Sequence, residues 1–457
     1  MKRYADYTRP MIPWVEKIPT HWKLIRNGGL FEYHQDKVGE RYNEFDLLSL
    51  STQGIKIKSV SDVKGKVPAS YEGYQEVNSG DMVFCLFDLD CSAVFAGLSQ
   101  KHGMITSAYD VAKPNSNIVN PKYLDYWFKS VFAGRYYKIY AKSVRYTINY
   151  DVFKAIKTPV PPYEEQDQIV RYLDWRVSKI NQLIYGYQKQ IKLLEERMQQ
   201  QISYAVLHST HNSEMIDSGV SFLGAIPSHW KVIQNKRLFK ERTEFSKRGD
   251  EELLSISKHY GVKPQSALKN NERFATIKPA ESLVGYKTVK KGDLAMNIMR
   301  ARNGSYGISD YDGIVSPAYC VFEPKIACNP IFLHYFMKTP HVINMFEAYS
   351  YGIVEHRRRL YAQEFLRLYS FLPPLGEQDE IAEHISNIQS KHKILKEKLQ
   401  MQIELLKEYM TRLISDVVTG QVDVRDVVIP EYTPEEYTEI DTDDTGEDME
   451  EVAEDAE

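Results

Sequence analysis

The stretch IPTHWKLIRNGGLF at residues 18–31 returns 208 residues later as IPSHWKVIQNKRLF at residues 226–239. A period this long indicates duplicated domains, because solenoid repeats run roughly 20 to 50 residues. The chain of 457 residues is therefore predicted to be a tandem repeat, and two similar bodies on one chain suggest a protein that engages two similar targets at once. Three shorter strings return at a spacing of 212: Gly80-Asp81 as Gly292-Asp293, Pro161-Pro162 as Pro373-Pro374, and Glu165-Gln166-Asp167 as Glu377-Gln378-Asp379.

Charge is distributed unevenly along the chain. The formal net charge is -4, but the segment from Glu431 onward holds fourteen acidic residues and neither Lys nor Arg. Residues 1–430 contain all 58 Lys and Arg but only 48 of the 62 Asp and Glu, so this body of the chain carries a net charge of about +10. A basic body fits a polyanionic partner. The acidic tail, residues 426–457, is predicted to be disordered; it either aids solubility or competes with DNA for the basic face.

Cysteine spacing and hydropathy exclude several protein classes. Cys85, Cys91, Cys320 and Cys328 form no CxxC pair and have no His at metal-ligand spacing, so neither a zinc site nor a disulfide framework is predicted. The longest apolar run, at residues 82–87, is too short to span a membrane. We expect a cytoplasmic protein without a membrane partner.

Each repeat begins with a β-rich part. Short β-branched and aromatic runs between Gly, Pro, Asn and Asp predict strands within residues 45–51, 75–87 and 286–299. Each β-rich part also predicts one helix, starting at Asn120-Pro121 and at Asn329-Pro330. Asn suits the N-cap position and Pro the first helical position.

Each repeat ends in a long amphipathic segment. Apolar residues at three- and four-residue steps predict a helix of about 45 residues near residues 164–208, and the stripe returns 212 residues later. Each narrow stripe can be buried by the other helix, so we predict an antiparallel coiled coil in a pseudo-twofold arrangement. His392, which stands where the first stripe has Ile180, is interpreted as a tolerated polar group. The predicted stripe residues are Leu173, Ile180, Leu183, Tyr187, Ile191, Leu194 and Met198 in the first helix, and Ile385, Leu395, Leu399, Ile403, Leu406 and Met410 in the second.

The predicted fold class is α+β, with two β-rich bodies alternating with the two long helices. The predicted boundaries are residues 1–160 for the first β-rich body, 161–212 for the first helix, 213–372 for the second β-rich body, 373–425 for the second helix and 426–457 for the acidic tail.

Motifs for catalysis and cofactor binding are missing. The sequence contains neither GxxxxGK[ST] nor a GxGxxG after a strand, and no HExxH. The strings NPKY and NPIF are better explained as helix caps than as methyltransferase motifs, since no glycine-rich cofactor loop precedes them. We therefore predict a non-catalytic chain that binds no cofactor or metal.

Candidate DNA contacts lie at equivalent positions with unlike chemistry. FDLDCSA near residue 88 becomes MRARNGS 212 residues later, and basic-aromatic stretches follow in both halves. Arg suits guanine, Asn suits adenine and Asp can accept from cytosine, so two heads could read different sequences. Solvated loops are the alternative interpretation. The candidates are Lys56, Lys58, Asp88, Asp90, Tyr137, Lys142 and Arg145 in the first half, and Lys287, Arg300, Arg302, Asn303, Tyr351, Arg357 and Arg358 in the second.

The chain resembles the specificity subunits of type I restriction-modification systems. The strings that carry the resemblance are GVSFLGAIPSHWKV (219–232), its degenerate copy PMIPWVEKIPTHWKL (10–24), PPYEEQDQI (161–169), PPLGEQDEI (373–381) and LISDVVTGQVDVR (413–425). The resemblance implies two domains that each read one half of a split double-stranded DNA target, with helices that set the gap and dock two modification subunits. It further implies that the modification subunits bind S-adenosylmethionine and methylate adenine, and that a restriction subunit uses ATP and Mg.

Two other functions remain open at this point. One is a coiled-coil scaffold without DNA specificity, which would lack salt-dependent DNA affinity. The other is a stand-alone DNA methyltransferase or nuclease, against which the missing cofactor motifs argue.

Overall fold

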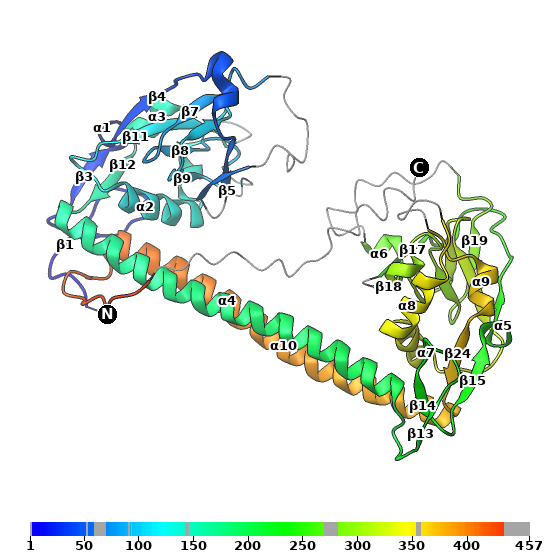
Figure 1. The fold of residues 1–457 in the computed structure, drawn as a ribbon. Helices are drawn as coiled ribbons and strands as arrows, with labels where there is room; N and C mark the ends of the chain where they lie inside the picture. Colours follow the sequence, from blue (N-terminus) through cyan, green and yellow to red (C-terminus); the bar gives the residue numbers. More distant parts are fainter. Residues whose placement is uncertain are drawn as a thin grey trace. The chain divides into compact units, whose positions relative to one another are not determined.

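The computed structural model describes residues 2–51, 54–58, 70–89, 92, 94–141, 146–258, 260–268, 282–352 and 358–433 (Figure 1). These residues divide into two units. Unit 1 contains residues 2–187 and 401–433, and unit 2 contains residues 188–400. The predicted disorder of the acidic tail lies outside the described residues from position 434 onward.

Unit 1 opens with a β-rich part. Its elements are β1 (Tyr7–Thr8), β2 (Ile18–Pro19), β3 (Lys23–Arg26), α1 (Asn27–Leu30), β4 (Phe31–His34), η1 (Gly39–Glu44), β5 (Leu48–Ser51), β6 (Gly54–Ile57), β7 (Gln75–Val77), β8 (Met82–Phe84), β9 (Ala96–Leu98), β10 (Gly103–Ile105), β11 (Asp110–Pro114), α2 (Pro121–Ala133), η3 (Tyr136–Tyr140), α3 (Tyr150–Ala155) and β12 (Lys157–Val160). The long helix α4 (Tyr163–Leu207) follows and continues into unit 2.

Unit 2 repeats this order. Its elements are β13 (Met215–Asp217), β14 (Ala225–Pro227), β15 (Lys231–Gln234), α5 (Asn235–Leu238), β16 (Phe239–Glu241), β17 (Leu254–Ser257), β18 (Gly261–Pro264), α6 (Gln265–Leu268), β19 (Lys287–Val289), β20 (Leu294–Met296), η4 (Ala301–Asn303), β21 (Tyr306–Ile308), β22 (Gly313–Val315), β23 (Cys320–Pro324), α7 (Pro330–Met337), α8 (Pro340–Ala348), α9 (Ala362–Arg367) and β24 (Tyr369–Leu372). The second long helix, α10 (Leu375–Val418), returns to unit 1.

The sheets match strand for strand. Unit 1 has a four-stranded antiparallel sheet in the order β4-β11-β8-β9, and unit 2 has the equivalent order β16-β23-β20-β21. The strand pairs β3–β12 and β15–β24, β5–β6 and β17–β18, and β7–β10 and β19–β22 are also equivalent. The predicted strands and the duplication are therefore confirmed.

The duplicated Gly-Asp string forms a tight turn before the central strand of each sheet. Gly80 and Gly292 have φ angles of 98° and 93°, which favour glycine. Asp81 accepts a hydrogen bond from Asn78 N at 2.7 Å, and Asp293 accepts one from Lys290 N at 2.8 Å. Each aspartate thus closes its own turn.

The two Asn-Pro strings cap helices, as predicted. Asn120 accepts a hydrogen bond from Lys122 N, and Asn329 accepts from Ile331 N and Phe332 N, with Pro at the start of each helix. The side-chain oxygen satisfies backbone donors that the first turn leaves without partners.

The glutamate of each Glu-Gln-Asp string joins a long helix to its β-rich body. Glu165 is buried and accepts hydrogen bonds from Tyr4 Oη at 2.6 Å and Trp22 Nε1 at 3.0 Å. His21 Nε2 lies 2.7 Å from the same carboxylate. In unit 2, His229 Nε2 and Trp230 Nε1 lie 2.7 and 3.1 Å from Glu377. The repeated His-Trp pair thus contacts the repeated glutamate in the same way in both units.

The glutamine and aspartate of each Glu-Gln-Asp string bind the asparagine that caps the Asn-Pro helix. The side-chain oxygens of Gln166 and Gln378 accept from the backbone N–H of Asn120 and Asn329 at 2.8 and 2.9 Å. Each glutamine also donates to the carbonyl of the first proline of its Pro-Pro pair, at 2.9 Å. The Asn120 and Asn329 amides donate to the following aspartates, Asp167 and Asp379, at 2.8 and 2.7 Å. The Glu-Gln-Asp tripeptide therefore fixes the start of each long helix against the Pro-Pro pair and against the helix that begins at the Asn-Pro string.

The C-terminal Thr-Gly-Gln-Val-Asp-Val-Arg segment completes unit 1. Gln421 donates to Lys17 O at 2.8 Å, and Asp423 N donates to Lys2 O at 3.0 Å. Arg425 forms two hydrogen bonds to Asp423 and lies over the Tyr4 ring at 4.9 Å. The N-terminal residues of the β-rich body are thus fixed by the end of the chain.

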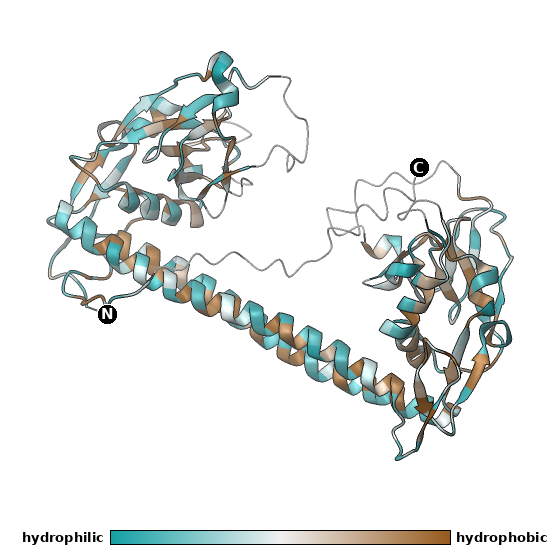
Figure 2. Ribbon diagram, viewed as in Figure 1, coloured by the Kyte–Doolittle hydropathy of each residue, from teal (hydrophilic) through white to brown (hydrophobic). Residues whose placement is uncertain are grey.

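The long helices run antiparallel within each unit, as predicted (Figure 1). In unit 1, Arg176 Nη2 bonds to Tyr409 Oη at 3.1 Å, and Gln168, which lies earlier on α4, bonds to Val424 and Val427, which lie beyond the end of α10. In unit 2, Glu195 pairs with Lys396, and Gln201 lies 2.9 Å from His392. Hydrophobic residues recur along both helices between polar ones (Figure 2).

Most predicted stripe residues are at least partly buried, but two are not. Leu183 and Leu395 are 53% and 45% exposed, so their assignment to the seam is wrong. Ile184, one helical turn after Ile180, is buried in place of Leu183. Leu173, Ile180, Ile191, Ile385 and Ile403 are buried, and Tyr187, Leu194, Met198, Leu399, Leu406 and Met410 are half-buried.

His392 lies at the helix pair of unit 2 and lines a groove of about 510 Å³ with Leu194, Met198 and Gln389. Its Nε2 lies 2.9 Å from Gln201 Oε1, and its Nδ1 is buried without a partner. The polar group interrupting the stripe is therefore accommodated by a facing glutamine.

Candidate nucleic-acid interface

In unit 2, the loop after β20 presents the predicted Arg and Asn side chains. The loop is closed by a hydrogen bond from Asn297 N to Ser305 O at 3.0 Å, and Gly304 follows η4 with a φ of 87°. Within it, Arg302 is partly exposed and Asn303 is exposed. Arg300, at the start of η4, is also partly exposed.

The second predicted segment of unit 2 lies against this loop. Leu360 N donates to Ile298 O at 2.9 Å, and Arg359 Nη2 lies 4.0 Å from Met299 Sδ. Arg359 also forms a two-bond backbone bridge with Tyr351, whose side chain is 55% exposed. Two loops that are about 50 residues apart in sequence thus form one surface.

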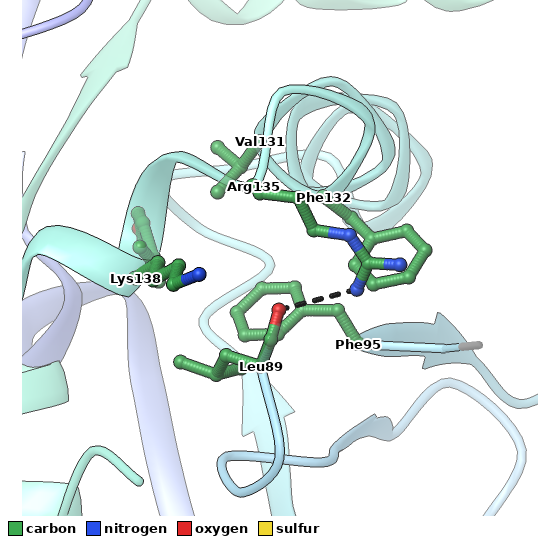
Figure 3. A pocket seen from close by; sticks show the side chains of 7 residues that line it. Leu89, Phe95, Val131, Phe132, Arg135 and Lys138 are labelled. Carbon is green, nitrogen blue, oxygen red and sulfur yellow. Dashed lines mark hydrogen bonds between the residues drawn. The ribbon is translucent and has the colours of Figure 1, made fainter. Parts of the chain in front are cut away.

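Unit 1 brings the equivalent segments together. Ile148 N donates to Leu86 O at 2.8 Å, and Leu89 N donates to Tyr146 O at 3.4 Å. Arg135 donates to the carbonyl of Leu89 in the loop that carries Asp88 (Figure 3). Asp88 is partly exposed and has a φ of 51°. The position of the predicted surface is therefore the same in both units, while its chemistry differs.

Several predicted contacts are placed differently by the structure. Tyr137 is 2% exposed and packs in the aromatic core, so its assignment to a DNA surface is wrong. The ammonium of Lys287 donates to Tyr319 O at 2.6 Å, and Arg358 donates to Ser350 O and Glu347 O, so both cations are engaged within the fold. Lys56 and Lys58 lie at the β5–β6 hairpin, outside both segments.

Four further candidates, Asp90, Lys142, Arg145 and Arg357, lie outside the described residues. Sequence reasoning missed the aromatic group beside the unit 1 surface, where the rings of Trp14 and Tyr136 stack at 5.3 Å and Tyr140 contacts Trp14 edge-on. The signal for it is the aromatic string at residues 136–140, but the contribution of Trp14 comes from a distant segment.

Burial acts on all three described thiols. Burial raises the pKa of Cys85 and Cys328, and raises the pKa of Cys320 to about 11. Across the described ranges, no group of three His, Cys, Asp or Glu side chains is arranged to hold a metal ion. No helix in the part of the chain that the structure describes has the length and hydropathy needed to cross a membrane.

The His334 side chain in unit 2 lies against β18 and β21. Its Cε1 is 3.1 Å from the position that a Cβ would take at Gly261, and 3.3 Å from the corresponding position at Gly307. Burial, helped by the charge of Lys338, lowers the pKa of His334 to about 4. Unit 1 has Asp125 at the equivalent position of α2.

We expect unit 2 to lose stability in mild acid because of His334. Its pKa in the folded state lies below the ordinary 6.5, so the unfolded state binds more protons between these values and stability falls as the pH falls from about 6.5 to 4. The loss is about 2 kcal/mol between pH 7 and pH 5. Hydrogen exchange at both pH values in wild type and His334→Gln measures it. Identical pH dependence in the two proteins would contradict this assignment.

The comparisons with known proteins agree with this arrangement. Residues 228–405 match the family model described as the type I restriction modification DNA specificity domain. Over 442 residues the chain is 24% identical to the putative type I restriction enzyme MjaX specificity subunit of Methanocaldococcus jannaschii, covering 90% of this chain and 96% of that protein. The chain is thus similar to type I specificity subunits.

Two further similarities extend over most of this chain. The type I restriction enzyme MjaVIII specificity subunit of the same organism is 22% identical over 437 residues, covering 90% of this chain and 95% of that protein. A chain in a solved structure concerned with complex assembly and conformational transition of the type I R-M system has a TM-score of 0.56 at 14% identity, covering 89% of this chain and 99% of that chain. The fold is thus shared along nearly the whole length.

Proposed function

We propose that this chain is the DNA-recognition subunit of a type I restriction-modification complex, in which each β-rich body reads one half of a bipartite target. One observation carries this proposal: the same loop surface occurs in both units, with Asp88 in one and Arg302 and Asn303 in the other. Arg, Asn and Asp select different base edges, so a repeated scaffold with unlike loops suits an asymmetric target.

The charge of the body supports DNA as the ligand. About +10 outside the acidic tail favours phosphate contacts, which position a protein on DNA before bases are read. Selection of duplexes from a randomised pool by the purified full chain tests the proposal. We expect enrichment of two short sequences at a fixed separation, with affinity that falls steeply as salt rises. Absence of both enrichment and salt dependence would instead favour a protein scaffold.

Arg302→Ala is expected to weaken reading of one half-site. Loss of a bidentate contact to guanine should reduce discrimination in that half by about 1–3 kcal/mol and leave the other half unchanged. Binding to libraries randomised in one half at a time provides the measurement. Arg367→Ala is the matched control, because Arg367 pairs with Glu364 on α9. Equal weakening by Arg302→Ala on every sequence would identify a phosphate contact instead.

The helix pair is the proposed dock for two modification subunits. Large apolar side chains are exposed on it in both units: Leu183, Met401 and Leu405 in unit 1, and Leu193, Ile394 and Leu395 in unit 2. Exposed apolar surface of this kind is typical of protein interfaces. The residues that form the helix seam hold this surface in place.

The chain itself is proposed to be non-catalytic and to bind no cofactor. S-adenosylmethionine would be bound by the modification subunits, and ATP and Mg by restriction subunits that join the complex. Incubation of the purified chain with S-adenosylmethionine and DNA should give no methyl transfer. Methyl transfer without partner subunits would overturn this division of labour.

A further inference from the structure

In unit 1, Arg135 is bound to the backbone of the loop that carries Asp88. Its Nη1 donates to Leu89 O at 3.2 Å and to Ser92 O at 2.7 Å, while its guanidinium lies 4.1 Å from the centre of the Phe132 ring (Figure 3). The same loop is closed by a hydrogen bond from Ser92 N to Asp88 O at 2.7 Å. One side chain therefore connects the segment after α2 to both sides of this turn.

In unit 2, Lys338 makes the corresponding contact with the loop of Arg302 and Asn303. Its ammonium donates to Gly304 O, directly after η4, and to Lys258 O at 3.4 Å. It also lies over the Tyr306 ring, 4.7 Å from its centre. Again a cation near the end of the Asn-Pro helix rests on an aromatic ring and binds loop carbonyls.

The two cations do not occupy equivalent sequence positions. The capping residues Asn120 and Asn329 are 209 residues apart, so Lys338 corresponds to Lys129 and not to Arg135. Lys129 instead pairs with Asp125 at 2.7 Å on α2 itself. The two units thus reach the same contact from different positions, which repeat comparison alone would not reveal.

In unit 1, the loop conformation requires such support. Asp88 has a φ of 51° and Arg135 itself has a φ of 51°, a region that residues with side chains seldom adopt. Backbone in sparsely populated regions persists only when its surroundings hold it there. Charged donors form the stronger hydrogen bonds to carbonyls, so each cation is well suited to fix its loop.

We infer that Arg135 and Lys338 are positioning residues that set half-site specificity by fixing the backbones of the loops carrying Asp88 and Arg302–Asn303, without contacting DNA themselves. This inference rests on the proposed function of DNA recognition. The charge of Arg135 and Lys338 would suggest phosphate binding, but their role here is to position the loops.

The test uses the full chain with Arg135→Gln or Lys338→Gln. Binding is measured against duplex libraries randomised in one half-site at a time, at several salt concentrations. We expect each variant to lose about tenfold discrimination in one half only, and the two variants to affect opposite halves. The slope of log K against log salt should stay unchanged, whereas loss of a phosphate contact would reduce it by about 0.9.

Control variants separate positioning from folding. Lys129→Gln, at the repeat-equivalent position of Lys338, should leave both halves unchanged. Arg135→Lys keeps the charge and should restore part of the discrimination. Hydrogen exchange at loop amides should accelerate in the glutamine variants while the strands of the same unit stay protected. If a glutamine variant unfolds its unit, Arg135→Lys and Lys338→Arg replace it in the test. We then expect a partial loss of discrimination in one half-site only.

Three outcomes would overturn the inference: unchanged discrimination, a reduced salt slope, or equal weakening on all sequences. Failure of the proposed function would look different, because the wild-type chain would then select no sequence from the pool. A selective wild type with equally selective glutamine variants would reject the positioning role alone.

Discussion

Glu377→Ala is expected to lower the free energy of unfolding of unit 2 by about 3–5 kcal/mol. The buried carboxylate accepts hydrogen bonds from Trp230 and Ser209 and pairs with His229. Its removal leaves the buried Trp230 indole without a partner, which costs about 1–3 kcal/mol, and removes the hydrogen bonds from the partly exposed Ser209 and His229, each worth about 0.5–1.5 kcal/mol. Hydrogen exchange along β15 and β24, with unit 1 as internal reference, measures the change.

Glu380→Ala is the matched control. Glu380 lies one turn further along α10, is about half exposed and accepts from Thr210 while pairing with His211. Because exposed ion pairs contribute little, we expect a loss below about 1 kcal/mol. A similar effect from both variants would contradict the importance assigned to the buried glutamate.

The same glutamate also predicts acid sensitivity of unit 2. Burial alone would raise its pKa, but hydrogen bonds from Ser209, His229 and Trp230, with the charge of His229, outweigh burial and lower it below 4.5. A carboxylate with a lowered folded-state pKa contributes stability above the ordinary value, and that stability is lost as the pH falls through the folded-state pKa. Glu377→Ala should remove this acid-dependent part.

Leu193→Lys combined with Ile394→Lys is expected to abolish assembly with the modification subunits. Both side chains are 54% exposed on the helix pair of unit 2. If each is a central interface contact worth at least about 2 kcal/mol, affinity should fall by roughly a thousandfold. Size-exclusion chromatography and titration of the partner subunit measure the loss.

The stability of the chain should hardly change, because surface substitutions are usually within about 0.5 kcal/mol. Gln199→Lys with Gln400→Lys adds the same charge at exposed positions without removing apolar surface. We expect this control to assemble normally. Normal assembly of the Leu193 and Ile394 variant would place the dock elsewhere, and loss of assembly in both proteins would indicate a charge effect.

The tandem construction and the long helices could be predicted because each leaves a local signal. The Glu-Gln-Asp string, the Asn-Pro caps and the Gly-Asp turns appear twice, and their side chains meet the same partners in both units. Periodicity located α4 and α10 but placed Leu183 and Leu395 on the wrong face. Three- and four-residue steps from Ile180 reach both Leu183 and Ile184, so periodicity alone does not decide which of the two is buried.

The surface was harder to predict than the fold. Repeat comparison located both loops, but it could not separate Tyr137, which is buried, from Tyr351, which is exposed, because both lie near basic residues in aromatic strings. The roles of Arg135 and Lys338 depend on backbone carbonyls that are distant in sequence. Contacts of this kind leave no pattern in the residue types.

Methylation-site mapping by long-read sequencing tests the central claim most directly. DNA from cells expressing this chain with a type I modification subunit is compared with DNA from cells lacking this chain. Two unlike reading heads predict a split, asymmetric adenine-methylation motif that disappears with the chain, and in which one half alone relaxes in the Arg302→Ala variant. A methylation motif that persists unchanged without the chain would contradict the account.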